Sequence, residues 1–268
     1  MAAAIRTRNG KHVRRLDDQL LALGLCTDAH QAQALILAGR VMVGEQKGLK
    51  PGQTVPLDAQ LRLIGDALPA YVSRGGVKLA GALQKLQVPV TGLHCLDIGA
   101  ATGGFTDCLL QHGAAHVVAV DVGYNLLHDK LRKDPRVTVF EKTHVRTLEP
   151  KQLPYLAELL VLDLSFIGVR QVLPALVPLV APGGSLLLMI KPQFELPRSQ
   201  VPNGGVVVDD QKRWQSVADV LQVAESLGLV KKAQVDSELP GPAGNREIFL
   251  WLHRPVLQRA PVPSDPWH

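Results

Sequence analysis

The chain of 268 residues contains few cysteines, and these few form no recognisable pattern. Cys26, Cys95 and Cys108 are odd in number and lack any Cys-x-x-Cys pair or metal-ligand spacing. The nine histidines are scattered along the chain as well. We therefore expect three small, buried thiols in a reducing cytoplasm and no bound metal.

Aromatic residues and long apolar runs are also scarce. Only 4% of the residues are aromatic, which argues against a protein that binds single strands mainly by stacking their bases. No apolar stretch approaches the roughly 20 residues of a membrane span. The N-terminus has no apolar segment behind its charges, so we expect no signal peptide. These absences argue against a membrane protein and predict a cytoplasmic one.

Positive charge is present in excess, and it is distributed unevenly. The net charge is +5. Residues 1–86 contain 12 Lys and Arg against 6 Asp and Glu, whereas the other 182 residues contain 17 against 18. A basic segment beside a nearly neutral one is expected of a protein that attaches to nucleic acid. The alternative is a basic N-terminus that only aids solubility.

The N-terminal part of the chain predicts a small α+β unit. Leu16, Leu20 and Leu23 share one face of a short helix, and Gly24 can end that helix. Thr27 is a suitable N-cap for a second short helix. Short apolar runs separated by glycine-rich turns follow the two helices and predict a small β element.

From residue 71 onward, strand-sized apolar runs alternate with helical patterns. The runs are residues 93–98, 117–120, 137–140, 159–164, 185–190, 230–235 and 248–252. Continuous apolar strands separated by helices predict an α/β fold, in which helices cover both faces of a mostly parallel sheet. The last two runs lie close together with a Pro-Gly-Pro turn between them, which favours an antiparallel closing pair.

The change of rhythm near residue 69 marks a domain boundary. We place a small basic domain at residues 1–67, a linker at residues 68–72 and the sheet domain at residues 73–254. The tail, residues 255–268, is rich in proline and is expected to be flexible.

The clearest motif in the sheet domain is residues 97–104, DIGAATGG, which follow a predicted strand and open a predicted helix. Its spacing differs from the Gly-x-Gly-x-x-Gly of dinucleotide-binding folds, whose loop holds a pyrophosphate. S-adenosylmethionine carries an ammonium group and no phosphate. The carboxylate of Asp97 would attract that ammonium, directly or through a water, and would repel a pyrophosphate. The motif therefore predicts an S-adenosylmethionine site.

A second acidic residue supports this interpretation. Asp121 ends the second predicted strand, where a carboxylate can accept hydrogen bonds from both ribose hydroxyls of a nucleoside. Each feature also has a purely structural alternative, because glycine-rich turns are common and an Asp at a strand end often caps a helix.

Two charged residues end the next predicted strands and suggest acid–base chemistry. Asp163 and Lys191 should face each other, because the carboxyl ends of neighbouring parallel strands line one crevice. A sugar hydroxyl must lose its proton as it attacks a methyl group, and a neutral amine can accept that proton. Lys78 could supply a second cation that favours the neutral amine, and Glu247 could orient the group. Alternatively, Asp163 only caps a helix and Lys191 only extends its stem over apolar surface.

Other acceptor atoms are disfavoured by what the chain lacks. Residues 163–166 are DLSF, whereas enzymes that methylate the amino groups of bases carry Asn-Pro-Pro-Tyr after the fourth strand. None of the three cysteines follows the fourth or fifth strand, so covalent attack on a pyrimidine ring is unsupported. A hydroxyl oxygen is thus the favoured acceptor.

The sheet domain resembles the RrmJ/FtsJ-type ribose 2′-O-methyltransferases, and the TlyA subfamily in particular. The matching segments are residues 71–79 (YVSRGGVKL), 97–107 (DIGAATGGFTD), 119–124 (AVDVGY) and 190–195 (IKPQFE). The resemblance implies a Rossmann-like seven-stranded sheet and a Lys-Asp-Lys-Glu catalytic tetrad. This tetrad falls on Lys78, Asp163, Lys191 and Glu247. The implied cofactor-binding residues are Asp97, Gly99, Ala100, Ala101, Gly103, Gly104, Phe105, Asp121, Val122, His144 and Asp163.

Residues 14–60 resemble the RNA-binding module named after ribosomal protein S-four. With the charge distribution, this implies an RNA-binding set of Arg6, Arg8, Lys11, Arg14, Arg15, Arg40 and Arg74. Two departures stand out: residues 28–30 are DAH where the module commonly has Ser-Arg, and His144 stands where relatives often carry Asn. Together the two modules imply a bacterial enzyme that methylates cytidine 2′-hydroxyls of 16S rRNA, 23S rRNA or both.

Four functional hypotheses remain open at this point. The leading one is an rRNA 2′-O-methyltransferase with rRNA or ribosomal subunits as partner, S-adenosylmethionine as cofactor and no metal, working as a monomer away from membranes. The second is a non-catalytic RNA-binding assembly factor with a vestigial pocket. The third is a membrane-active haemolysin, as members of this family are often labelled. The fourth is methylation of a base within the same fold.

Overall fold

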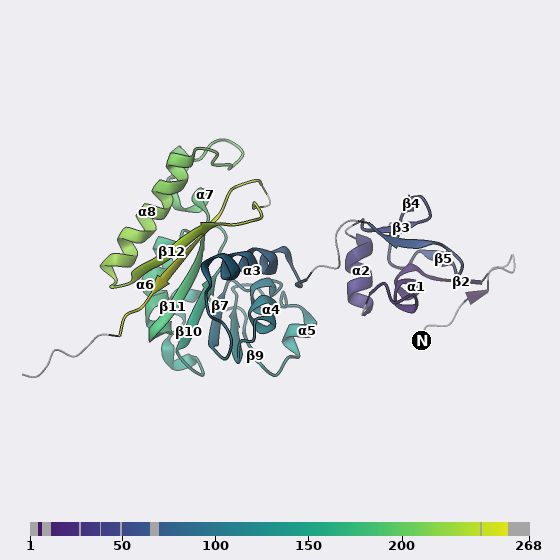
Figure 1. The fold of residues 1–268 in the computed structure, drawn as a ribbon, viewed down its shortest axis with the longest axis horizontal. Coiled ribbons are helices and arrows are strands. Elements are labelled where there is room, and N and C mark those ends of the chain that lie inside the picture. Colours follow the sequence, from purple (N-terminus) through teal and green to yellow (C-terminus); the bar gives the residue numbers. More distant parts are fainter. Residues whose placement is uncertain are drawn as a thin grey trace, which may run out of the picture. The chain divides into compact units, whose positions relative to one another are not determined.

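The computed structural model describes residues 5–6, 12–26, 28–37, 39–48, 50–64, 70–241 and 243–256. The chain divides into two compact units, with the division between Leu68 and Pro69 (Figure 1). Of the residues singled out above, Arg8, Lys11, Thr27, residues 68–69 of the predicted linker and the tail from residue 257 lie outside the described residues, and Arg6 is described only in its backbone.

In its described residues, the N-terminal unit consists of two short helices and two small antiparallel sheets. Its elements are β1 (Ile5–Arg6), β2 (His12–Arg15), α1 (Leu16–Ala22), α2 (Ala29–Leu37), β3 (Val41–Val43), β4 (Gln46–Lys47), β5 (Thr54–Pro56) and β6 (Leu61–Leu63). The sheet orders are β1-β2-β5 and β4-β3-β6. We expected the helices to come first, and this was wrong, since the strand β2 precedes α1. Residues 12–15 form a strand because their backbone pairs with β5.

The first helix is shorter than its apolar pattern predicted. Leu16 and Leu20 are fully buried as expected, but α1 ends at Ala22 and Leu23 is 50% exposed. Gly24 follows with φ +67°, a left-handed conformation that glycine adopts without steric cost. The side chain of Asp28 caps α2, since its Oδ1 accepts a hydrogen bond from Gln31 N at 2.8 Å.

The second unit is built on a seven-stranded sheet with the order β12-β13-β11-β10-β7-β8-β9 (Figure 1). Its strands are β7 (His94–Ile98), β8 (His116–Val120), β9 (Val137–Phe140), β10 (Ala157–Leu162), β11 (Val180–Ile190), β12 (Val230–Asp236) and β13 (Ile248–His253). All neighbours are parallel except β13, which is antiparallel to both β11 and β12. The predicted antiparallel closing pair is therefore confirmed.

Helices cover both faces of this sheet. They are α3 (Arg74–Leu86), α4 (Gly104–Gln111), α5 (Asp129–Arg132), α6 (Val169–Leu176), α7 (Pro192–Glu195) and α8 (Asp210–Ser226), with single 3-10 turns at Val145–Thr147, Pro150–Gln152, Val177–Leu179 and Arg198–Gln200. Side chains alternate along each strand, so one apolar core lies between the sheet and α3, α4 and α5, and the other between the sheet and α6 and α8. Along β10, for example, Leu160 faces the second core while Leu159 and Val161 face the first.

The topology brings several loops to one edge of the sheet. Strands β7 and β10 are neighbours, and the chain leaves them in opposite directions across the sheet, toward β8 and toward β11. At such a reversal the loops after the strands separate and leave a crevice for a ligand. Within the described residues, no helix is long and apolar enough to span a membrane.

Candidate active site

The loop between β7 and α4 is shaped by two glycines with positive φ. Gly99 has φ +85°, and a Cβ built there would lie 2.3 Å from the carbonyl oxygen of Asp163. Gly103 has φ +93°, and its Cβ would lie 2.3 Å from a methyl group of Leu131. Any side chain at either position would displace a neighbour, so the glycines of the motif let the loop lie against the adjacent strand end and helix.

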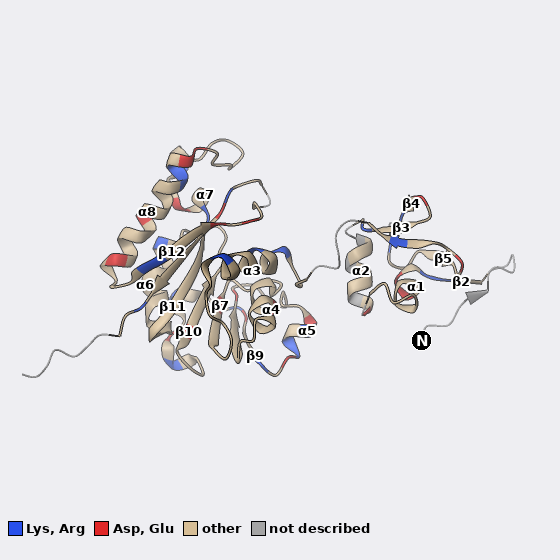
Figure 2. Cartoon of the chain, viewed as in Figure 1, with Lys and Arg blue, Asp and Glu red and all other residues tan. Residues whose placement is uncertain are grey.

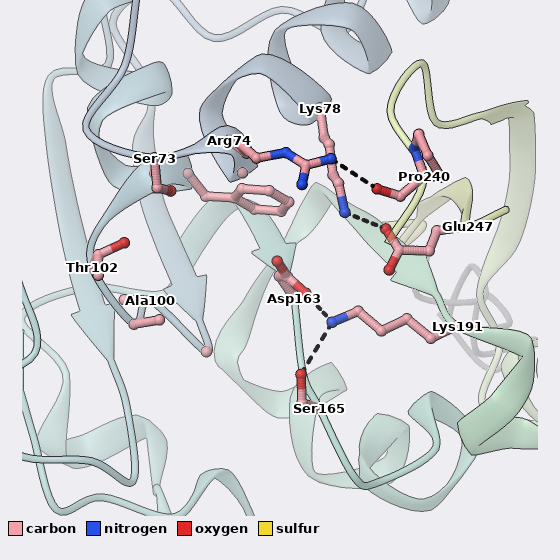
Figure 3. A pocket seen from close by; sticks show the side chains of 15 residues that line it. Ser73, Arg74, Lys78, Ala100, Thr102, Asp163, Ser165, Lys191, Pro240 and Glu247 are labelled. Atoms are coloured by element: carbon pink, nitrogen blue, oxygen red, sulfur yellow. Dashed lines mark hydrogen bonds and ion pairs between the residues drawn. The ribbon is translucent and has the colours of Figure 1, made fainter. Parts of the chain in front are cut away.

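Two cavities lie beside this loop. The first has a volume of about 470 Å³ and is lined by Ser73, Arg74, Gly75, Lys78, Gly99, Ala100, Ala101, Thr102, Gly104, Phe105, Asp163, Ser165, Lys191, Pro240 and Glu247 (Figure 3). The second has a volume of about 210 Å³ and is lined by Ile98, Gly99, Val120, Asp121, Val122, Thr143, His144, Val145, Leu164, Ser165, Phe166, Ile167 and Val172. Gly99 and Ser165 border both, so the two cavities are adjacent.

The four predicted tetrad residues all line the first cavity, where they form two ion pairs (Figure 3). Lys191 Nζ lies 2.6 Å from Asp163 Oδ1, and Lys78 Nζ lies 2.5 Å from Glu247 Oε2. The Lys78–Glu247 pair is the more buried, with side chains 8% and 1% exposed. We expected Lys78 to serve as a second cation near Lys191 and Glu247 to orient the group; in this structure Lys78 and Glu247 are each other's ionic partner. Pairing of this kind offsets the cost of burying each charge.

Asp121 is held in a fixed orientation in the second cavity. Its Oδ2 accepts a hydrogen bond from Ala101 N at 2.8 Å, and its Oδ1 accepts one from Gly123 N at 2.7 Å. Each carboxylate oxygen has a further lone pair that can accept a hydroxyl. Val122 and His144 lie on the same cavity, whose remaining lining is mainly apolar. This combination suits a nucleoside.

Asp97 lies beneath the loop and not on the wall of either cavity. Its side chain is fully buried, and its Oδ2 accepts a hydrogen bond from the Thr106 hydroxyl at 2.7 Å. Its Oδ1 has no hydrogen-bond partner among the described residues. Burial raises the pKa of Asp97 to about 7, and the Thr106 hydrogen bond only partly opposes this. Of the predicted cofactor residues, Asp97 and Gly103 are the two that do not line a cavity.

The lining also contains residues that sequence reasoning missed. Ser73 and Thr102 lie inside the matching segments 71–79 and 97–107, which could have singled them out, whereas Thr143, Phe166 and Pro240 lie outside those segments. Ser165 had a usable signal, since it follows Asp163 by two residues at a strand end. Its Oγ accepts a hydrogen bond from Lys191 Nζ at 3.2 Å.

An exposed aromatic side chain stands at the second cavity. Phe166 is 90% exposed and has φ +69°, an unusual backbone conformation for a bulky residue. Its ring lies 5.6 Å from the ring of Phe194, centroid to centroid. Large exposed apolar groups with strained backbones are uncommon, and they concentrate at binding sites.

The predicted RNA-binding arginines differ in what they contact. Arg15 makes a bidentate ion pair with Asp17, with distances of 3.0 and 2.7 Å, and the Nε of Arg40 donates to the Ile64 carbonyl at 3.0 Å. Arg15 nevertheless remains 51% exposed, so an anion can still approach it. Basic residues are not confined to the N-terminal unit, and Figure 2 shows them on α3 and β12 as well.

Arg74 is the only member of this predicted set that lines the first cavity among those the structure describes. It begins α3, and its Nη2 donates to the Pro240 carbonyl at 3.3 Å (Figure 3). In the described part of the chain, no group of three His, Cys, Asp or Glu side chains is placed to hold a metal ion.

Comparisons with known proteins place the chain in a family. Residues 71–254 match the model of the FtsJ-like methyltransferases, and residues 14–61 match the S4 domain. The chain is 46% identical over 238 residues, 89% of both chains, to the 16S/23S rRNA (cytidine-2′-O)-methyltransferase TlyA of Mycobacterium tuberculosis. It is 33% identical over 182 residues, 68% of this chain and 70% of the relative, to the 23S rRNA (cytidine-2′-O)-methyltransferase TlyA of Campylobacter jejuni. A solved structure described as a hemolysin from Streptococcus thermophilus is 36% identical, covers 94% of this chain and 92% of its own, and superposes with a TM-score of 0.71.

Proposed function

Because the chain belongs to the TlyA family of FtsJ-like methyltransferases, we propose that it transfers a methyl group from S-adenosylmethionine to the 2′-hydroxyl of a cytidine in rRNA. The 16S rRNA, the 23S rRNA or both are the substrates, and the protein works in the cytoplasm, where ribosomes are made. The observation that carries the proposal is the Lys191–Asp163 ion pair in a cavity adjacent to the one that holds Asp121.

The residues present fit S-adenosylmethionine. Asp121 would accept the ribose hydroxyls of the adenosine, and the apolar lining of the second cavity would take up the adenine. The loop from Gly99 to Thr102 would hold the amino-acid end in the first cavity. Since Asp97 lies beneath this loop, it would act on the ammonium group through a water or through its charge. When bound, the cofactor supplies an activated methyl group.

The chain itself has to remove one proton. Lys191, in its neutral form, would accept the proton of the 2′-hydroxyl as the ribose oxygen attacks the methyl carbon. Asp163 holds the Lys191 amine in place. The Lys78–Glu247 pair would bind the ribose from the other side of the same cavity. Catalysis would then consist of positioning and proton removal, since the methyl group is already activated.

Two residues on the cavities would contact RNA. Arg74, which lines the first cavity, would bind a phosphate next to the target nucleotide. Phe166 offers an exposed ring on which a base removed from its stack can lie. The S4 domain would supply additional, sequence-independent contacts with the RNA backbone.

Transfer of labelled methyl from S-adenosylmethionine to purified 16S rRNA, 23S rRNA and ribosomal subunits tests the proposal. Nuclease digestion and mass spectrometry of the product should find 2′-O-methylcytidine. A methylated base would instead support the base-methylation alternative. If calorimetry detects no cofactor binding and the labelling assay detects no methyl transfer, the assembly-factor alternative is supported. Lys191→Ala should lower the rate by at least about 100-fold, because it removes the base.

A further inference from the structure

Ser165 occupies the junction of the two cavities, since it borders both. It lies in the turn that follows β10, two residues after Asp163. Figure 3 shows Asp163 and Ser165 extending from this turn toward the same nitrogen, Lys191 Nζ. The nitrogen lies 2.6 Å from Asp163 Oδ1 and 3.2 Å from Ser165 Oγ.

The number of bonds on that nitrogen limits its orientation. A neutral lysine amine has a bond to Cε, two N–H bonds and one lone pair, arranged as a tetrahedron. Ser165 Oγ accepts one N–H, and Asp163 Oδ1, which has no hydrogen-bond partner among the described residues, lies 2.6 Å from the nitrogen. The negative charge of that carboxylate disfavours a lone pair on its side, so one direction remains for the lone pair. Both groups are side chains of a single turn, whose backbone is joined to β7 by a hydrogen bond from Asp163 N to Ile98 O of 3.0 Å.

Without Ser165, no hydrogen bond among the described residues would fix the direction of the lone pair. The amine could then turn about the Cε–Nζ bond between staggered positions. The neighbouring Lys78 and Glu247 are already paired with each other, with Lys78 Nζ 2.5 Å from Glu247 Oε2. Among the described contacts, Ser165 is therefore the hydrogen-bond acceptor that restricts this rotation.

We propose that Ser165 is a positioning residue that directs the lone pair of Lys191 toward the acceptor hydroxyl. This inference rests on the proposed function of the site and deepens it. In the step concerned, the O–H bond of the acceptor breaks and an N–H bond forms on Lys191. The acceptor oxygen forms a bond to the methyl carbon, and the sulfur keeps the electron pair of the C–S bond that breaks. Ser165 loses no proton in this step.

The experiment compares Ser165→Ala and Ser165→Thr with the wild type and with Ser226→Ala. Ser226 ends α8, and its hydroxyl donates to the Val223 carbonyl away from both cavities, so this variant is a matched control. For each protein, kcat and KM are measured with labelled S-adenosylmethionine and the rRNA that the wild type methylates. Calorimetry gives the affinity for the cofactor, and thermal unfolding checks the fold.

Ser165→Ala should lower kcat about tenfold, because a misdirected base loses part of its catalytic effect. Its KM for rRNA and its cofactor affinity should stay within about twofold of wild type, and Ser165→Thr should recover most of the rate. An undiminished kcat in Ser165→Ala would overturn the proposal, as would a loss confined to KM or cofactor affinity. Absence of transfer by the wild type would overturn the proposed function itself, which makes the two failures distinguishable.

Discussion

Lys78 and Glu247 are 169 positions apart in the chain, yet their charged groups are in contact, with Lys78 Nζ 2.5 Å from Glu247 Oε2. The lysine belongs to α3 and the glutamate directly precedes β13. Both side chains are almost completely buried. The pair therefore joins the first helix of the sheet domain to its last strand at the wall of the first cavity.

Removal of one member of this pair should destabilise the protein strongly. Glu247→Ala leaves the Lys78 ammonium buried without its partner, at an expected cost of about 3 to 5 kcal/mol in the free energy of unfolding. The double variant Lys78→Met/Glu247→Leu should recover most of that loss while remaining inactive. Urea unfolding gives the stabilities. If the double variant proves as unstable as Glu247→Ala, the cost does not come from the unpaired charge.

Asp97 should make stability depend on pH. Burial raises its pKa to about 7 in the folded protein, so the folded state binds this proton more tightly than the unfolded state does. Stability should therefore decrease as the pH rises from about 4 to 7, by up to about 4 kcal/mol, and should change little through this group above pH 7. Asp97→Asn should remove this decrease. Urea unfolding at several pH values compares the two proteins, and parallel curves for both would exclude the effect.

Cofactor affinity should depend on Asp121. Asp121→Ala removes the carboxylate that we expect to bind the ribose hydroxyls, and it also frees the amides of Ala101 and Gly123. The loss of charge-assisted hydrogen bonds predicts a Kd for S-adenosylmethionine that is about 10 to 100 times higher. Asp134→Ala is a suitable control, because Asp134 pairs with Arg136 away from the cavities. Calorimetry measures both, and equal affinities would show that the nucleoside binds elsewhere.

Phe166 should affect the RNA and not the cofactor. Phe166→Ala is expected to lower kcat/KM for rRNA about tenfold or more, which corresponds to the loss of one base–aromatic contact. Phe166→Tyr keeps the ring and should retain most of the activity. Calorimetry with S-adenosylmethionine should give the same affinity for all three proteins. A parallel loss of cofactor affinity in Phe166→Ala would show instead that the ring binds the cofactor.

Much of the fold and of the site could be predicted from local patterns. The apolar runs identified the seven strands of the large sheet, because a buried strand appears in the sequence as a short, uninterrupted run of apolar residues. The same runs located Asp121, Asp163 and Lys191 at strand ends, and the parallel order of the sheet brings such ends to one edge. The resemblance added Lys78 and Glu247 to the set.

The rest depends on contacts that no local pattern encodes. The pairing of Lys78 with Glu247, and not with the Asp163 side of the site, follows from how α3 and the loop before β13 meet. The burial of Asp97 beneath its own loop follows from the packing of α4, which supplies Thr106. The strand β2 went unrecognised because its HVRR sequence is strongly polar, and pairing with β5 outweighs that composition.

The reversed direction of β13 determines which part of the chain could be exchanged to change the hydroxyl group that is methylated. Because β13 runs against its neighbours, its beginning lies where their ends lie, and the loop before it reaches the first cavity with Pro240 and Glu247. None of the described residues of that loop lines the second cavity. Exchange of residues 237–246 between homologues would therefore alter one wall of the first cavity, where the acceptor hydroxyl would bind, and leave the lining of the second cavity unchanged, so this loop is a suitable segment for redesigning which hydroxyl is methylated.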